Sequence, residues 1–134
     1  VRDERPPRRD RHVTASVNRS PVRNVEKIIN NIDSGKEQII DARSAGRFKG
    51  VDAEPRPSKK VVHIPGSLSL PFSQLMDPKN HFIYRPADEI KAAVDQAGID
   101  LNRPISASCG SGVTACVLAL GLYLIGHKNT AVYD

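Results

Sequence analysis

Residues 104–116 read PISASCGSGVTAC, and this short stretch joins a candidate strand to a candidate helix. The first five residues are partly apolar and begin with proline, which is typical of a buried strand in an α/β sheet. Glycines follow at Gly110 and Gly112, where a turn is expected. The stretch therefore predicts a strand, a tight turn and a helix, with Cys109 at the end of the strand. The apolar residues of the helix recur at Val113, Val117, Leu120 and Leu124.

The same alternation of strands and helices continues on the amino-terminal side. We expect helices at residues 24–34 and 86–98, the first capped by Asn24 and ended by Gly35. Strands that alternate with helices predict an α/β fold, with a doubly wound, mostly parallel sheet and helices on both faces. The strands are expected at residues 12–17, 38–42, 67–71, 105–108 and 131–133. One face of each helix is apolar: Val25, Ile28, Ile29 and Ile32 in the first, and Ile90, Ala93, Val94 and Ala97 in the second.

Cys109 is the candidate nucleophile of the chain. Successive N–H groups of a glycine-containing turn can point at its sulfur, and the positive end of the following helix favours a thiolate. The alternative is a buried cysteine without chemistry, which is the usual place of a free cysteine. Cys116, inside the predicted helix, is interpreted as a core residue that forms no disulfide with Cys109. Two free thiols indicate a reducing compartment.

Residues 41–47 and 109–114 both follow predicted strands, so we expect them to face one pocket at the carboxyl edge of the sheet. Arg47 and Arg56 lie in the first of these loops, where prolines on both sides of Arg56 stiffen the backbone. Guanidinium groups bind carboxylates through two parallel hydrogen bonds, so these arginines are candidate carboxylate ligands. The alternative is that they pair with Asp41, Asp52 or Glu54. Arg43 is interpreted as a structural residue that ties the loop to a carboxylate.

The charge of the chain is concentrated at its start. Residues 1–23 contain seven arginines and three acidic residues, which accounts for +4 of the formal net charge of +5. We interpret residues 1–11 as a basic linker or tail and residues 12–134 as one domain. The tail has no aromatic residues to stack on bases, and no stretch approaches the ~20 apolar residues of a membrane span, so neither nucleic acid nor a membrane is an expected partner. Because the chain begins at Val1, we expect a fragment or a processed product.

Three blocks of the sequence carry a family resemblance. CGSGVT at residues 109–114, DARSAGRFKG at residues 41–50 and HIPGS at residues 63–67 occur in the order found in rhodanese-type sulfurtransferases. The loop at Cys109 resembles the version in the carboxyl-terminal catalytic domain of 3-mercaptopyruvate sulfurtransferases. The chain departs from the family at Val62, where glycine is usual.

This resemblance implies a mechanism in which Cys109 takes the sulfur of 3-mercaptopyruvate as a persulfide and pyruvate leaves. Cyanide or a thiol, such as thioredoxin or a low-molecular-weight thiol, then accepts the sulfur, and no cofactor is needed beyond the persulfide itself. The resemblance implies that Arg47 and Arg56 bind the donor and that Ser111 handles a proton. The loop residues expected to hold the sulfur or substrate are Gly110, Gly112, Val113 and Thr114. An amino-terminal rhodanese-like domain absent from this chain would complete the enzyme, in the cytoplasm or mitochondrion.

Other readings remain open at this point. A thiosulfate sulfurtransferase and a catalytically silent rhodanese-like module both fit the same motifs. A cysteine phosphatase does not, because its loop needs an arginine six residues after the cysteine, where this chain has Ala115. His63 is interpreted as a turn-stabilising residue rather than a catalytic one. His12, His81 and His127 lack metal-ligand spacing with the cysteines, so no metal is expected.

Overall fold

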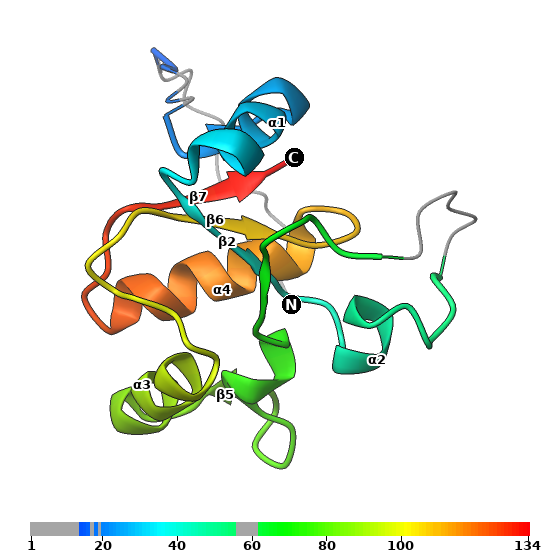
Figure 1. Ribbon diagram of the computed structural model, residues 1–134. Coiled ribbons are helices and arrows are strands. Elements are labelled where there is room, and N and C mark those ends of the chain that lie inside the picture. Colours follow the sequence, from blue (N-terminus) through cyan, green and yellow to red (C-terminus); the bar gives the residue numbers. More distant parts are fainter. Residues whose placement is uncertain (1–13, 17, 19, 56–61) are drawn as a thin grey trace, which may run out of the picture.

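A computed structural model describes residues 14–16, 18, 20–55 and 62–134. Its main sheet has five parallel strands in the order β1-β7-β6-β2-β3 (Figure 1). These strands are β1 (Val22–Arg23), β2 (Gln38–Asp41), β3 (Leu68–Ser69), β6 (Ile105–Ser108) and β7 (Thr130–Tyr133). A small antiparallel pair is formed by β4 (Met76–Asp77) and β5 (Ile83–Tyr84). The helices are α1 (Val25–Ser34), α2 (Ala45–Phe48), α3 (Ala87–Gln96) and α4 (Val113–Leu124), with a 3-10 turn at Phe72–Gln74.

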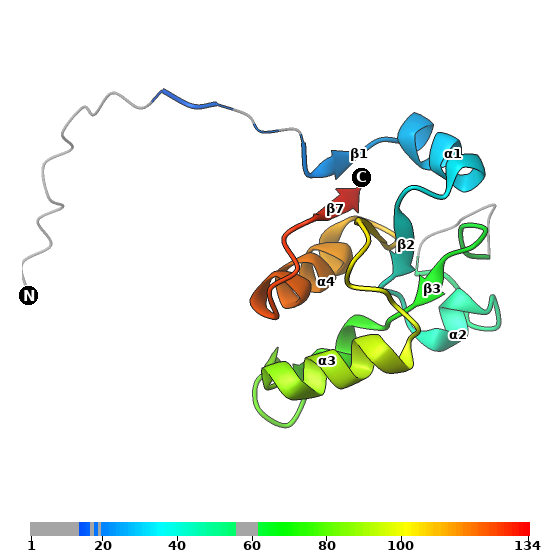
Figure 2. The same cartoon turned by 60° about the vertical axis from the view of Figure 1, so that its left-hand side comes forward.

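The two faces of the main sheet carry different helices. Figures 1 and 2 show α1 on one face and α4 on the other, with α3 next to α4 on that side. This arrangement confirms the predicted doubly wound, mostly parallel α/β fold. Central strands of such a sheet are covered on both faces, and accordingly every residue of β6 is buried.

The hydrophobic core lies between the sheet and the pair α3 and α4. Ile90 and Val94 of α3 are buried, and Ala93 and Ala97 pack against the same cluster, as the helical spacing predicts. Gly121 of α4 is required there, because a Cβ at this position would lie 2.8 Å from Leu75 Cδ1. Close packing therefore explains a glycine in the middle of a helix, where it otherwise disfavours helix formation.

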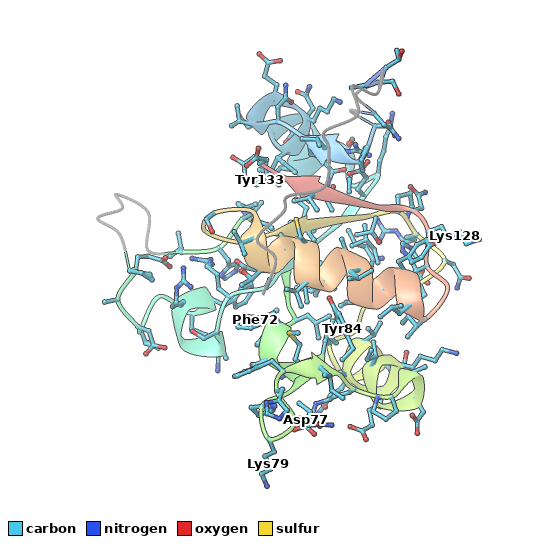
Figure 3. All side chains as sticks on the ribbon, turned by 180° about the vertical axis from the view of Figure 1, so that it is seen from behind. Phe72, Asp77, Lys79, Tyr84, Lys128 and Tyr133 are labelled. Carbon is cyan, nitrogen blue, oxygen red and sulfur yellow. The ribbon has the colours of Figure 1, made fainter. Side chains whose placement is uncertain are left out.

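The buried face of α4 is not the one suggested by its apolar spacing. Ala115, Leu118 and Leu122 are buried, whereas Val113, Leu120 and Leu124 are exposed. Cys116 is also exposed, so its interpretation as a core residue is wrong. The reason is that α4 is apolar on all sides, and its periodicity cannot indicate which side meets the sheet. Figure 3 shows Tyr84 beside this helix, where its hydroxyl donates to the Val117 carbonyl at 2.9 Å.

Helix α1 confirms its predicted ends but buries less than expected. Asn24 accepts a hydrogen bond from the Lys27 N–H, and Gly35 ends the helix in the left-handed conformation. Of the four apolar residues predicted on one face, only Ile28 is buried; Val25, Ile29 and Ile32 are exposed.

The edge strand was expected too early in the chain. Residues 14–16 form no strand, and β1 begins at Val22 instead. The physical reason is that an edge strand pairs on one side only, so its position depends on its single neighbour, here β7 through Val22 opposite Val132. Three predictions lie outside the described residues: the tail at residues 1–11, residues 12, 13 and 17 of the expected strand, and Arg56.

Candidate active site

Two loops leave the sheet side by side because β2 and β6 are neighbours. The last residues of the two strands, Asp41 and Ser108, stand opposite each other in register. From β2 the chain continues to β3 on one side, and from β6 it continues to β7 on the other. Connections that diverge in this way leave a crevice at the carboxyl ends of the strands. The predicted pocket between residues 41–47 and 109–114 is therefore built by the strand order itself.

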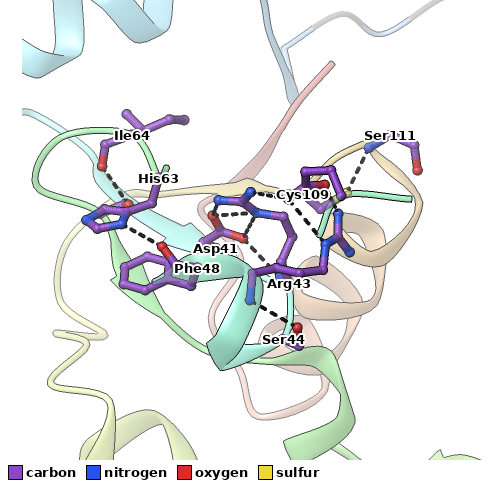
Figure 4. Close-up of polar contacts among 11 residues, drawn as sticks. Asp41, Arg43, Ser44, Phe48, His63, Ile64, Cys109 and Ser111 are labelled. Carbon is purple, nitrogen blue, oxygen red and sulfur yellow. Dashed lines mark hydrogen bonds and ion pairs between the residues drawn. The ribbon is translucent and has the colours of Figure 1, made fainter. Parts of the chain in front are cut away.

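Cys109 lies directly after β6, at the entrance to this crevice. It is partly exposed, and the N–H of Ser111 points at its sulfur with N and Sγ 3.5 Å apart (Figure 4). Gly112 has φ +77°, a conformation that glycine adopts readily, and α4 begins at the next residue. The turn thus folds the backbone around the thiol, as the glycine spacing predicts.

The environment of Cys109 lowers the pKa of its thiol. Burial acts in the opposite direction, since a charged group is less stable away from water. That effect is outweighed by hydrogen bonds from the Thr114 hydroxyl and from the N–H groups of Ser111, Ala115 and Thr114. All four donors stabilise the thiolate, which is the nucleophilic form of cysteine.

A small cavity of about 210 Å³ opens beside the thiol loop. Arg47 stands in its wall next to Gly110, where a Cβ would lie only 3.1 Å from Arg47 Nη2. A side chain at position 110 would thus crowd the end of Arg47, whereas Gly112 is favoured for its backbone conformation. The cavity is lined by Arg47, Glu54, Pro55, Gly110, Ser111 and Thr114.

A chain of ion pairs supports the arginine side of the cavity. Asp41 accepts from the Nε and Nη2 of Arg43, with Nη2 and Oδ2 2.7 Å apart, and Arg43 Nη1 reaches Glu54 at 2.8 Å (Figure 4). Glu54 also binds Arg47, with Nη2 and Oε2 2.5 Å apart. Arg43 is buried, and its predicted structural role is confirmed. Arg47 lines the cavity and pairs with Glu54, so the ion pair considered from sequence is present, whereas binding of a donor carboxylate stays a prediction.

His63 contacts the end of helix α2, in the segment between β2 and β3. Its Nδ1 lies 2.9 Å from the Phe48 carbonyl oxygen, and its ring stacks on the Phe48 ring with centroids 3.9 Å apart. The histidine thus fastens the end of α2, and its interpretation as a turn-stabilising residue is confirmed.

The structure brings together most of the residues singled out in the sequence. Arg47, Gly110, Ser111 and Thr114 line one cavity. Cys109 lies beside it, because its sulfur accepts hydrogen bonds from Ser111 and Thr114. The side chain of Val113 is 68% exposed, and Arg56 lies outside the described residues.

Two contributions escaped the sequence analysis. Ala115 donates its N–H to the sulfur, and no side-chain pattern could indicate this because the donor is backbone. Glu54 was considered only as a surface partner of an arginine, whereas it joins two arginines, and its side chain is 14% exposed.

Within residues 14–16, 18, 20–55 and 62–134, no three His, Cys, Asp or Glu side chains cluster closely enough to hold a metal ion. In the same described part of the chain, no helix has the length and apolar character needed to cross a bilayer.

Comparison with known proteins points to one family. Residues 24–134 match the model of the rhodanese-like domain. The chain is 46% identical over 110 residues to thiosulfate/3-mercaptopyruvate sulfurtransferase 1, mitochondrial, of Arabidopsis thaliana, covering 82% of this chain and 28% of that protein. It is 40% identical to mouse 3-mercaptopyruvate sulfurtransferase over 121 residues, covering 90% of this chain and 40% of that protein.

Among solved structures, the fold is similar to the crystal structure of SseA from Escherichia coli, one of the 3-mercaptopyruvate sulfotransferases. The TM-score is 0.76 at 33% identity, and the match covers 92% of this chain and 44% of the other. The chain thus spans less than half the length of each of these relatives.

Proposed function

The chain belongs to the rhodanese-like domain family, and from that premise we propose that it is the catalytic part of a 3-mercaptopyruvate sulfurtransferase. The observation that carries the proposal is the position of Cys109, whose sulfur faces backbone and hydroxyl donors beside a cavity with an arginine in its wall. The names of the Arabidopsis and mouse relatives support the same activity.

The first half of the reaction loads the enzyme. The Cys109 thiolate attacks the sulfur of 3-mercaptopyruvate, a sulfur–sulfur bond forms, and the carbon–sulfur bond breaks. The electron pair of that bond leaves on pyruvate as its enolate, which takes up a proton to give pyruvate. Cys109 then carries the persulfide, and the donors that hold the thiolate are fixed in place before the reaction, so they also stabilise the negative charge on the bound sulfur. No cofactor takes part in these steps.

The second half returns the enzyme to its starting state. An acceptor thiolate or cyanide attacks the outer sulfur, the sulfur–sulfur bond breaks, and Cys109 leaves as a thiolate. The open position of the loop, where Gly110 and Ser111 are exposed, gives an acceptor such as thioredoxin or a low-molecular-weight thiol access to the outer sulfur.

Mercaptopyruvate is preferred over thiosulfate as the donor in this proposal. Residues 109–116 carry no charged side chain, so a doubly charged donor has no cation within the loop to balance it. Arg47 offers its guanidinium to one carboxylate, and Arg56 is the second proposed carboxylate ligand. Ser111, exposed next to the thiol, is the proposed proton carrier.

A second domain and a location complete the proposal. The relatives are more than twice as long as the match, which supports at least one further domain. The family resemblance implies that this domain is rhodanese-like and amino-terminal to this one. The name of the Arabidopsis relative supports a mitochondrial location, and the two free cysteines suit either the mitochondrial matrix or the cytoplasm.

The test is donor-resolved kinetics on the full-length gene product. Incubation with 3-mercaptopyruvate alone should add the mass of one sulfur atom to the peptide that contains Cys109 and release pyruvate. The Cys109→Ser variant should do neither. A wild-type protein that forms no adduct with either donor would indicate the silent module, and one that prefers thiosulfate would indicate the other transferase.

A further inference from the structure

Glu54 holds an unusual position for an acidic residue beside a site that must receive anions. Its carboxylate is shared by Arg43, at 2.8 Å, and Arg47, at 2.5 Å, and its side chain is 14% exposed. It also lines the cavity next to the thiol loop. An acidic group at this place repels every anionic sulfur donor. A surface ion pair with no effect on donor binding therefore does not explain the position of Glu54.

We propose that Glu54 is the specificity-determining residue of this site, selecting singly charged carboxylate donors against doubly charged ones by fixing and partly neutralising Arg47. This inference rests on the proposed sulfur transfer and names how the donor class is chosen. Glu54 acts through Arg47 and through its own charge, so it is a positioning residue and not a catalytic one.

Glu54 fixes the orientation of the Arg47 guanidinium. Arg47 donates to Glu54 through Nε and Nη2, the side edge of its guanidinium. Among the described residues, no side chain or carbonyl accepts from Nη1, so the outer edge, formed by Nη1 and the second Nη2 hydrogen, can take two carboxylate oxygens. Nη2 lies next to Gly110, which places this edge beside the loop of Cys109. Glu54 is fixed in turn by Arg43, which is anchored on Asp41.

Glu54 also sets the net charge of the site. Asp41, Arg43, Glu54 and Arg47 form a linked set of two anions and two cations, so the set is neutral before a donor arrives. The hydrogen bond from Arg47 is the largest cause that lowers the pKa of Glu54, and the bond from Arg43 adds to it, so Glu54 stays ionised at neutral pH. A donor with one negative charge meets one arginine edge, whereas a second charge on the donor is left facing Glu54. Discrimination therefore grows with the charge of the donor.

The test uses the charge of an alkylating probe and needs no enzymatic turnover. Iodoacetate and iodoacetamide are similar in size and differ by one negative charge, and both alkylate thiolates. Their rates at Cys109 are measured by mass spectrometry in the full-length protein, in a Cys116→Ser background because Cys116 is exposed. The iodoacetamide rate corrects for any change in the exposure or reactivity of the thiol.

We expect Glu54→Gln to raise the ratio of iodoacetate to iodoacetamide rates by about fivefold, because removing one negative charge near the thiol favours an anionic probe. Glu54→Asp keeps the charge and should stay within about twofold of the wild type on the same electrostatic grounds. Glu89→Gln is the matched control, since Glu89 is exposed on α3 and pairs only with Arg85 at 3.1 Å among the described residues. The proposal is overturned if the ratio of iodoacetate to iodoacetamide rates changes no more in Glu54→Gln than in Glu89→Gln. It is also overturned if Glu54→Asp raises this ratio as much as Glu54→Gln does.

Donor kinetics separate this inference from the proposed function. With Glu54→Gln, kcat/KM for thiosulfate should rise relative to that for 3-mercaptopyruvate by about fivefold, because the dianion gains more from the lost repulsion. If the wild type transfers sulfur and kcat/KM for the two donors changes equally in Glu54→Gln, only the proposed role of Glu54 fails. If the wild type uses neither donor while the probe ratio still shifts, the proposed function fails and the charge selection by Glu54 stands.

Discussion

Thr114 should control the ionisation of Cys109, and replacing it with valine tests this directly. Valine has nearly the shape of threonine but no hydroxyl, so the change removes one hydrogen bond to the sulfur and leaves the backbone donors of Ser111, Thr114 and Ala115 in place. Position 114 lies in the first turn of α4 and is half-buried, so a β-branched replacement keeps the local packing.

The size of the effect follows from the nature of the bond. A hydrogen bond to a charged group contributes about 1.5–3 kcal/mol, and the exposed loop around this one places it near the lower limit. Since 1.36 kcal/mol corresponds to about one pKa unit, Thr114→Val should raise the pKa of Cys109 by about 1. The sign follows because the hydroxyl stabilises only the thiolate, so its loss favours the protonated form. Below the pKa, the fraction of thiolate then falls by about tenfold at a given pH.

The assay is the pH dependence of alkylation of Cys109 by iodoacetamide, again in the Cys116→Ser background. In the wild type the rate should rise through a pKa below 9.0, the ordinary value for cysteine. Thr114→Val should move the profile to higher pH, and Thr114→Ser, which keeps the hydroxyl, should stay with the wild type. The reasoning is refuted if the valine and serine variants titrate together, or if the wild type already titrates at the ordinary value.

The remaining predictions concern the donor, the core and acid stability. Arg47→Ala should lower kcat/KM for 3-mercaptopyruvate by about tenfold to a hundredfold, the loss expected for a charged hydrogen bond; a loss below about twofold would reject the carboxylate contact. Leu118→Ala should destabilise the domain by about 2–5 kcal/mol in urea unfolding, because Leu118 is fully buried, whereas Leu120→Ala, at a position 50% exposed on the same helix, should change stability by less than about 0.5 kcal/mol. Glu37 has a lowered pKa: burial raises it, but hydrogen bonds from Arg23 and Ser106 outweigh burial. The stability that these bonds contribute is therefore complete above pH 4.5 and lost as the pH falls through the lowered value, so Glu37→Gln should flatten the acid side of the stability profile, and an unchanged profile would contradict this.

Several features of the fold followed from local patterns. The cap at Asn24 and the left-handed Gly35 depend on short-range hydrogen bonds and on backbone sterics, which neighbouring residues in the chain control. The turn at Gly112 is local in the same sense. The alternation of strands and helices restricted the topology to a parallel sheet, and a parallel sheet brings the ends of its strands to one edge. The sequence alone therefore predicts that Cys109 and the loop after Asp41 face one pocket.

Other features depend on residues that are distant in the chain. Helix α4 is apolar all round, so only its contact with the sheet selects Leu118 and Leu122 as buried residues and leaves Cys116 exposed. The edge strand β1 has one neighbour, and its register comes from β7, more than a hundred residues later.

The same division holds in the site itself. The type of chemistry is encoded in a few consecutive residues, because a thiol, two glycines and a helix start are enough to set up a thiolate turn. The balance of charge around that turn is not encoded locally. Asp41, Arg43, Arg47 and Glu54 could pair in several ways, and the sequence does not distinguish them because long charged side chains reach many partners. The packed loops leave one arrangement, in which Glu54 joins both arginines.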